Sequence, residues 1–404
     1  MLSLLEHTDS ARLDWRGVAV LYPEQTEPTM YRALKSRARV GFGPTALDEL
    51  YRAVDVVLVW GVTAAEQRLP RPPRRCKVVL VSHGSGPWTA RVFSQYARAD
   101  AYAAVSRQAL LPVPEAVRPD TTVIGNCFEP ERVAASPGAR AALRGEWGVR
   151  PGEAVLGYLG RLSNEKNPGA LIAAVEADAS VRGVFVGTGA MLSDLQARTS
   201  TSPAHDRIVF HGAVELPGDA LSAFDAMVLP SHEEGCAIVV LEAWAAGCPV
   251  IATPVGIAPE WPELVRTIPL GPSGAAIAEA LAADRADPAG TRARVERAKE
   301  VAQAQFSPAA FGAAWTELVA RVNTAPPTKK TPPWLADTAY VQTSVTPSPA
   351  EVAAERDIIA RVNACPYRGC RVSCTSAKCA AGKGDQGEGN VATMSHCRVC
   401  VAGS

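Results

Sequence analysis

Short runs of apolar residues, many of them β-branched, alternate with alanine-rich stretches over the first 320 residues of the chain. The apolar runs are mostly continuous, which is typical of parallel strands covered by helices on both faces. The expected strands are 18–21, 54–60, 77–82, 101–105 and 122–124, then 154–159, 183–186, 207–210, 226–229 and 250–252. Alternation of strands and helices predicts parallel sheets with right-handed crossovers.

The expected strands form two sets, separated by a segment rich in Pro, Gly and Arg at 129–150. We therefore predict an α/β fold with two doubly wound domains, over 1–145 and 146–322, and a cleft between them. Six prolines interleaved with Thr and Ser over 323–349 predict a semi-rigid linker. A small cysteine-rich module is expected over 350–404.

Composition narrows the classes of protein. With 47% apolar and 20% charged residues, the chain has ample material for cores. Its 41 basic residues balance 41 acidic ones, which argues against a dedicated nucleic-acid binder. No run approaches the roughly 18 apolar residues of a membrane span, and the first residues lack the features of a secretory signal. We therefore expect a soluble, cytoplasmic protein without a membrane span.

The first candidate chemistry lies at the ends of two expected strands, where α/β sheets bind ligands. The strand 154–159 runs into Gly160, and Arg161 and Lys166 follow on the same loop, just before an expected helix. A helix N-terminus with two cations can hold a diphosphate, although both residues can equally be solvated loop charges. Gly187 and Gly189 follow the strand 183–186 and permit either a close backbone approach to a ligand or a tight turn.

A third junction follows the strand 226–229. The loop 231–237 leads into an apolar helix, 238–247, that contains one acid, Glu242. A carboxylate in such a helix is costly unless it is paired, or unless it reaches solvent from a partly exposed helix. Glu234 stands eight residues earlier, which is roughly 12 Å if both residues are helical. That distance is about the length of a ribose–diphosphate–hexose fragment, so one acid can hold the ribose and the other the sugar.

The segment 231–253 resembles the signature of retaining nucleotide-sugar glycosyltransferases of the family 4 type, which have the GT-B fold of two Rossmann-like domains. Glu234 and Glu242 match the acid-x7-acid motif of that family, also written EX7E, and the loop 160–166 matches its phosphate-binding loop. The segments 186–189 and 209–214 follow in the family's order. The resemblance covers residues from about 75 to 320.

The resemblance implies roles for individual residues. Glu234 would contact hydroxyls of the transferred sugar and Glu242 the ribose, while Arg161 and Lys166 would stabilise the departing diphosphate. His83, after the strand 77–82, occupies the place of the family's active-site histidine; the alternative is a strand-end histidine bonded to backbone. The remaining donor-binding candidates are Gly160, Gly187, Gly189, Gly212, Gly235, Cys236 and Ala237.

The resemblance implies transfer from a nucleoside-diphosphate sugar to an unknown acceptor, with retention of anomeric configuration. No Asp-x-Asp pair suited to a divalent metal stands at a strand end, so no cofactor is expected for catalysis. Two features depart from the family: the segment 22–26 lacks a glycine pair, and Cys236-Ala237 replaces the usual aromatic–glycine pair. The alternatives are a nucleotide-sugar 2-epimerase of the same fold and a non-catalytic nucleotide-sugar-binding scaffold.

The ten cysteines are unevenly placed. Cys76, Cys127, Cys236 and Cys248 stand in apolar settings, where thiols are expected in the core. The other six crowd into the tail, as Cys365, Cys370, Cys374, Cys379, Cys397 and Cys400. Grouped thiolates in an intracellular protein favour a metal, so structural zinc is a candidate there. An iron–sulfur cluster, disulfides and unstructured thiols are the alternatives.

Overall fold

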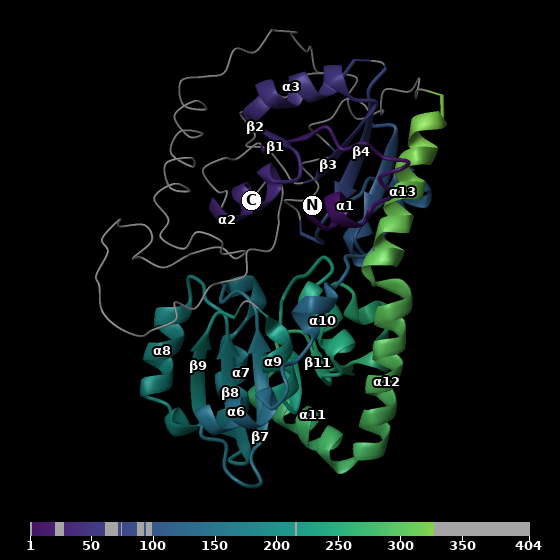
Figure 1. Cartoon of the computed structure of the whole chain (residues 1–404). Coiled ribbons are helices and arrows are strands. Elements are labelled where there is room, and N and C mark those ends of the chain that lie inside the picture. Colours follow the sequence, from purple (N-terminus) through teal and green to yellow (C-terminus); the bar gives the residue numbers. More distant parts are fainter. Residues whose placement is uncertain are drawn as a thin grey trace, which may run out of the picture. The chain divides into compact units, whose positions relative to one another are not determined.

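The computed structural model of the chain describes residues 2–20, 28–60, 72–73, 75–86, 93, 99–214 and 216–326. The described residues form two compact units (Figure 1). The first consists of the described residues up to Gly125 together with the described residues from Ala309 onward, and the second lies within Asn126–Pro308. Most of the linker, all six cysteines of the tail and the segment 22–26 lie outside the described residues, so the zinc site stays a prediction.

The units divide at 125 and 308, whereas the sequence predicts boundaries at 145 and 322. Side-chain bonds at both ends account for the difference. Arg140 and Arg144, on the helix that precedes the first strand of the second unit, pair with Asp225 of that unit at 2.7 and 3.0 Å. At the other end, the Lys77 ammonium of the first unit donates to the carbonyl of Val322 at 2.8 Å, which ties the last described helix to the first unit.

Six parallel strands form the sheet of the second unit, in the order β12-β11-β10-β7-β8-β9. Their bounds are β7 Ala154–Leu159, β8 Val181–Val186, β9 Ile208–Gly212, β10 Ala226–Leu229, β11 Val250–Ala252 and β12 Arg266–Thr267. All five predicted strands of this set are confirmed, and only the two-residue β12 was not predicted. The chain order reverses between β7 and β10, which is the switch point where doubly wound sheets bind ligands.

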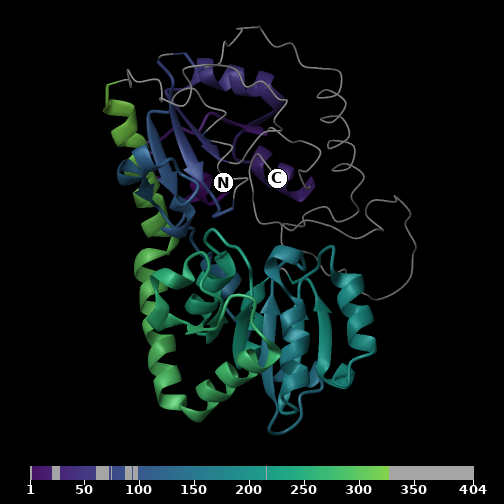
Figure 2. The same cartoon turned by 180° about the vertical axis from the view of Figure 1, so that it is seen from behind.

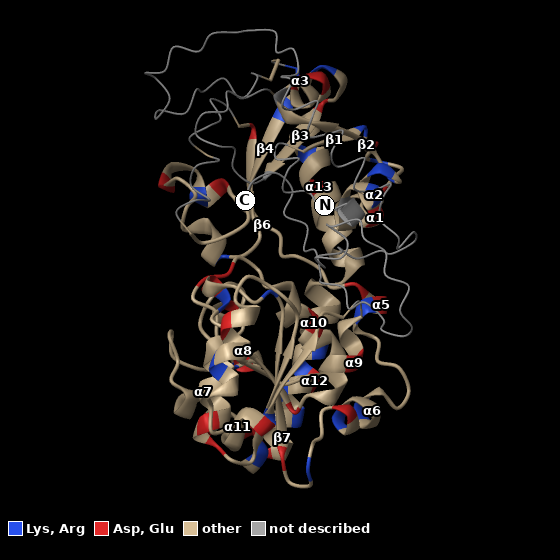
Figure 3. Ribbon diagram, turned by 90° about the vertical axis from the view of Figure 1, so that its left-hand side faces the viewer, with Lys and Arg blue, Asp and Glu red and all other residues tan. Residues whose placement is uncertain are grey.

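Helices cover both faces of this sheet (Figure 3). One face packs against α7 and α11 through a core that includes Leu156, Leu171 and Leu281. On the other face Phe224 lies under Gly157, and Trp147 stacks on Phe224 with ring centroids 5.8 Å apart. The helices of the unit are α5 Pro130–Val133, α6 Ala139–Glu146, α7 Gly169–Ala177, α8 Leu192–Ser200, α9 Pro217–Ala223, α10 Ile238–Ala246, α11 Gly274–Ala286 and α12 Pro288–Gln305. Its 3-10 helices are η4 Asn164–Lys166, η5 His205–Arg207, η6 Ala258–Glu260 and η7 Pro262–Leu264.

The first unit contains two parallel sheets (Figure 2). The strands β1 Gly17–Val20 and β2 Arg39–Phe42 form one, and β3 Val56–Trp60, β4 Lys77–Ser82, β5 Ala101–Ala104 and β6 Thr122–Val123 form the other. The described helices here are α1 Leu2–His7, α2 Pro28–Lys35, α3 Gly43–Ala53, η2 Gln108–Leu110, η3 Glu115–Asp120 and α13 Pro308–Thr324. The α/β architecture with parallel sheets is thus confirmed in both units.

The cysteines outside the tail are free thiols and are buried, as expected: Cys76, Cys127, Cys236 and Cys248. Burial raises the pKa of Cys248 to about 12, so its thiol stays protonated and behaves as a small apolar side chain. Over the part of the chain that the structure describes, no helix is both long enough and apolar enough to cross a membrane.

Candidate functional site

The carboxyl ends of β7, β8 and β9 are joined by backbone hydrogen bonds just past the strands. The amide of Gly160 donates to the carbonyl of Val186 at 2.9 Å, and the amide of Gly187 donates to the carbonyl of Gly212 at 2.7 Å. The loops that carry the predicted phosphate-binding residues therefore lie next to one another at one edge of the sheet. This is the edge where parallel α/β sheets bind ligands.

The loops after β7 and β8 approach each other so closely that only glycine fits at two positions of the second loop. Gly187 has a φ of +143°, and a Cβ at this position would collide with the carbonyl oxygen of Gly160. A Cβ on Gly189 would likewise collide with the carbonyl of Leu162. Loop packing alone thus explains both glycines, and their contact with a donor stays a prediction.

Lys166 and Glu234 meet at the switch point of the sheet. Lys166 ends the 3-10 helix η4 after β7, and Glu234 lies in the loop between β10 and α10. The Lys166 Nζ lies 2.6 Å from Glu234 Oε2, and the hydroxyl of Ser231 donates to Glu234 Oε1 at 2.9 Å. The two side chains are 18% and 5% exposed. The predicted phosphate-binding cation and the predicted sugar-binding acid therefore form one largely buried ion pair.

Arg161 takes a different partner. Its guanidinium lies 3.2 Å from Glu165 Oε1 and is 70% exposed. Burial raises the pKa of Glu165, but the hydroxyl of Ser163 at 2.6 Å, together with Arg161 and Lys166, holds it below its usual value. The two cations of the predicted phosphate clamp are therefore paired with two different carboxylates, one at the surface and one buried.

Glu242 lies in the second turn of α10 and is 2% exposed, so it does not reach solvent from a partly exposed helix. Its Oε1 accepts a hydrogen bond from Arg132 Nε at 3.0 Å. Glu234 precedes α10, which begins at Ile238, so the separation of roughly 12 Å expected for two helical residues does not apply. The sequence predicts that this acid needs a partner, but it does not identify Arg132 as that partner.

The loop that precedes α10 is held by bonds to distant segments. The side-chain amide of Asn126 donates to the carbonyl of Cys236 at 2.8 Å, and the hydroxyl of Thr253 donates to the carbonyl of Ser231 at 2.6 Å. Ala237 is the N-cap of α10 and makes no side-chain cap bond. The first amides of α10 therefore point out of the helix beside Gly235 and Cys236, an arrangement that favours an anion.

His83 stands directly after β4, at the carboxyl end of that strand in the first unit. The ring is half-buried, and its withdrawal from solvent lowers the pKa of His83 to about 4. The imidazole is therefore neutral near pH 7, and its predicted catalytic role stays a prediction.

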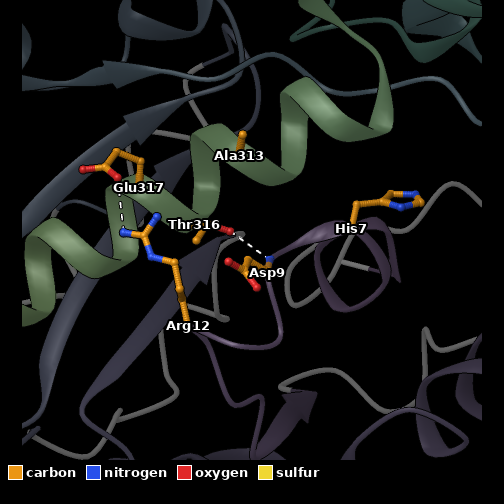
Figure 4. A pocket seen from close by; sticks show the side chains of 6 residues that line it. All are labelled: His7, Asp9, Arg12, Ala313, Thr316 and Glu317. Carbon is orange, nitrogen blue, oxygen red and sulfur yellow. Dashed lines mark hydrogen bonds and ion pairs between the residues drawn. The ribbon is translucent and has the colours of Figure 1, made fainter.

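A hollow in the first unit lies between the end of α1 and α13 (Figure 4). The backbone amide of Asp9 donates to the hydroxyl of Thr316 at 3.0 Å, and Arg12 lies 3.3 Å from Glu317. None of the predicted site residues lines this hollow. We assign its polar contacts to the attachment of α13 to the first unit.

The sequence of the second unit is similar to a known family. Residues 153–284 match the family described as Glycosyl transferases group 1. The chain is 34% identical to the D-inositol 3-phosphate glycosyltransferase of Mycobacteroides abscessus over 128 residues, which are 30% of this chain and 29% of that protein. It is 32% identical to the 2-deoxystreptamine glucosyltransferase of Streptomyces kanamyceticus over 142 residues, or 33% of this chain and 36% of that protein. The chain therefore spans about a third of the length of these relatives.

Solved structures define the class of fold. HepE of Anabaena, crystallised in complex with UDP, aligns with a TM-score of 0.64 and 19% identity over 79% of this chain and 95% of that one. A glycosyltransferase from Rickettsia africae aligns with a TM-score of 0.59 and 14% identity over 73% and 88%. The chain thus has the α/β fold of GT-B glycosyltransferases. Within it, the region 153–284 is similar to the group 1 glycosyl transferases, which confirms that part of the expected resemblance.

Proposed function

We propose that this protein is a glycosyltransferase that moves a sugar from a nucleoside-diphosphate sugar to an acceptor, with retention of anomeric configuration. The observation that carries the proposal is the Lys166–Glu234 ion pair, which joins a cation after β7 to an acid before α10 at the switch point of the sheet. Both residues lie within the region that matches group 1 glycosyl transferases. HepE, which shares the fold, has been crystallised with UDP and with UDP-glucose.

In this proposal the departing diphosphate is neutralised by Lys166 and by the free amides at the start of α10. Negative charge grows on the diphosphate as the glycosidic bond breaks, so fixed positive groups at this position lower the barrier. Glu234 accepts hydrogen bonds from hydroxyls of the sugar, and Ser231 keeps one of its oxygens oriented. Glu242 accepts a hydrogen bond from a hydroxyl of the ribose.

A donor screen tests the proposal. The full chain is incubated with uridine, guanosine and adenosine diphosphate sugars, and release of nucleotide is measured with and without candidate acceptors. We expect slow hydrolysis of one donor class, and loss of that activity in Glu234→Gln. Glu296→Gln, an exposed substitution on α12, is the control and should retain full activity. The absence of binding and turnover for every donor would overturn the proposal, and a donor epimer formed without acceptor would support the 2-epimerase instead.

If Lys166 and helix amides neutralise the diphosphate, turnover should not require a divalent metal ion. We expect EDTA to leave turnover of the identified donor unchanged within experimental error, because no divalent ion takes part in this proposal. The measurement is the initial rate before and after chelation, followed by addition of Mg²⁺ or Mn²⁺. A rate that falls with EDTA and returns with either ion would contradict metal independence.

A further inference from the structure

We infer that Arg132 is a positioning residue that holds Glu242 in the orientation needed to bind the ribose of the donor. The inference rests on the proposed function and extends it to a residue outside the region 153–284 that matches the family. Arg132 lies on α5, far from Glu242 in the sequence, and its Nε meets Glu242 Oε1 at 3.0 Å.

Burial makes this contact important for Glu242. The helix α10 is otherwise apolar, with the sequence IVVLEAWAA, and the Glu242 side chain is 2% exposed. An ionised carboxylate at such a depth needs a charged or hydrogen-bonding partner. Arg132 supplies both the charge and a directed N–H.

Arg132 is itself fixed in place. The helix α5 packs against both α9 and α10. The carbonyl groups of Val133 and Ala134 lie so close to Gly218 of α9 that a Cβ there would collide with them. The backbone beside Arg132 is therefore closely packed against α9, which limits the movement of Arg132 relative to Glu242.

The incomplete bonding of Glu242 distinguishes it from structural carboxylates of the same unit. Asp284, also buried, uses both oxygens: Arg266 Nε donates to Oδ1 at 2.8 Å, and Arg294 contacts Oδ2 at 2.5 Å. Among the described residues, by contrast, only Oε1 of Glu242 has a protein partner, and Oε2 has none. A carboxylate with one oxygen fixed and the other unoccupied by protein can accept a bond from a ligand hydroxyl.

The test measures discrimination between ribose and deoxyribose. Isothermal titration of the full chain with UDP, GDP and ADP first identifies the nucleotide that binds, and the titration is repeated with its 2′-deoxy form. We expect the wild type to prefer the ribonucleotide about tenfold, as for a hydrogen bond to a charged group. In Arg132→Gln the affinity for the ribonucleotide should fall about tenfold, while the affinity for the deoxynucleotide changes little.

Two further variants separate positioning from folding. Arg144→Gln removes an arginine from Asp225, at the amino end of β10, and should lower the melting temperature without changing the ribose preference. If Arg132→Gln does not fold, Glu242→Gln and the double variant are compared, since the first removes the buried carboxylate itself and the second removes both charges. The double variant should show the same small ribose preference as Glu242→Gln alone.

The outcomes are distinguishable. An equal loss of affinity for the ribonucleotide and the deoxynucleotide in Arg132→Gln would mean a merely structural role and would overturn the inference. A wild type that binds none of the three nucleoside diphosphates would instead count against the proposed function itself.

Discussion

In the sheet of the second unit, charged side chains lie both where the strands begin and where they end. We call these two sides the amino edge and the carboxyl edge, and the charges are arranged differently on each. At the amino edge, Glu153 directly precedes β7 and pairs with Arg182 of β8 at 2.9 Å. Asp225 directly precedes β10. Its carboxylate forms ion pairs with Arg140 and Arg144 and accepts a hydrogen bond from the amide of Val155. At this edge, each carboxylate thus accepts hydrogen bonds from at least one arginine side chain and from a backbone amide.

The carboxyl edge contains several glycines and a carboxylate, Glu234, that is paired with a lysine. Gly160, Gly187 and Gly212 bring the strand ends close together, and Glu234 pairs with Lys166 and accepts a hydrogen bond from the Ser231 hydroxyl. Lysine presents a compact charge on a flexible stem, so its partner can be exchanged more readily than the bonds of an arginine fork. We therefore interpret the amino edge as the part that holds the sheet together, while ligand binding at the carboxyl edge stays part of the proposed function.

The pKa values at the amino edge agree with a structural role. Burial raises the pKa of Asp225, but the Val155 amide and the two arginines more than offset it, and the net pKa is lowered. Glu153 behaves in the same way: burial raises its pKa, and Arg182 and the amide of Arg150 bring it below the usual value. Both groups therefore stabilise the fold as ions.

The largest effect is expected for one acid at the carboxyl edge. Glu234→Gln should reduce the transfer rate about a thousandfold, or about 4 kcal/mol in activation free energy, because an amide cannot accept the same bonds from the sugar as an ion. Its melting temperature should fall as well, because Lys166 loses its charged partner. The matched amino-edge variant, Asp225→Asn, should retain most of the transfer rate and lose stability. Equal loss of activity in both variants would remove the distinction between the edges.

The second prediction concerns stability at the amino edge. Arg182→Met removes the partner of Glu153, and both side chains are less than 10% exposed, at 4% and 8%. We expect the free energy of unfolding to fall by about 3 kcal/mol, because the buried carboxylate then keeps only the exposed guanidinium of Arg150, 4.0 Å away, as a counter-charge. Urea denaturation measures the change. Removing both charges, in Glu153→Gln with Arg182→Met, should recover part of the loss; no recovery would show that packing rather than charge explains it.

The third prediction tests the glycines of the carboxyl edge. Gly187→Ala should cost about 2 kcal/mol of unfolding free energy, because the φ of +143° is strained for any side chain and the Cβ meets the Gly160 carbonyl. Gly145→Ala on α6 is the matched control, since a Cβ there meets nothing within 4 Å. It should be neutral or slightly stabilising. A Gly187→Ala variant as stable as this control would show that the two loops can separate freely.

The sequence predicted some strands better than others, for physical reasons. The strands 154–159, 226–229 and 250–252 were predicted to the residue, because each is a continuous apolar run that is buried along its whole length. The strand β2 Arg39–Phe42 was not predicted, since it has four residues of which only the last is buried. A short, half-exposed run carries no apolar signal, and its pairing with β1 is a tertiary feature.

In the candidate site, too, some residues could be predicted from the sequence and others could not. Lys166 and Glu234 were found because the residues near them follow strand ends in a recognisable order. The partner of Glu242 was not found, because Arg132 is 110 residues away in the chain. An apolar helix sequence predicts that an acid within it is buried. The identity of a distant partner, however, depends on tertiary packing, which no local sequence pattern encodes.

The smallest expected effect is the pH dependence of stability. Asp225 and Glu153 have folded-state pKa values below their ordinary values of 3.8 and 4.5, so the stability they contribute is complete above about pH 5. It is lost as the pH falls through those values toward the lower folded-state values, because the unfolded chain then binds more protons. Asp225→Asn should be less stable than the wild type at pH 7, and the difference should narrow by on the order of 1 kcal/mol toward pH 3. Urea midpoints at pH 7, 5, 4 and 3 measure this, with Asp194→Asn, at an exposed position on α8, as the control. A difference that stays constant with pH would show that the pairing at the amino edge does not favour the ionised form of Asp225.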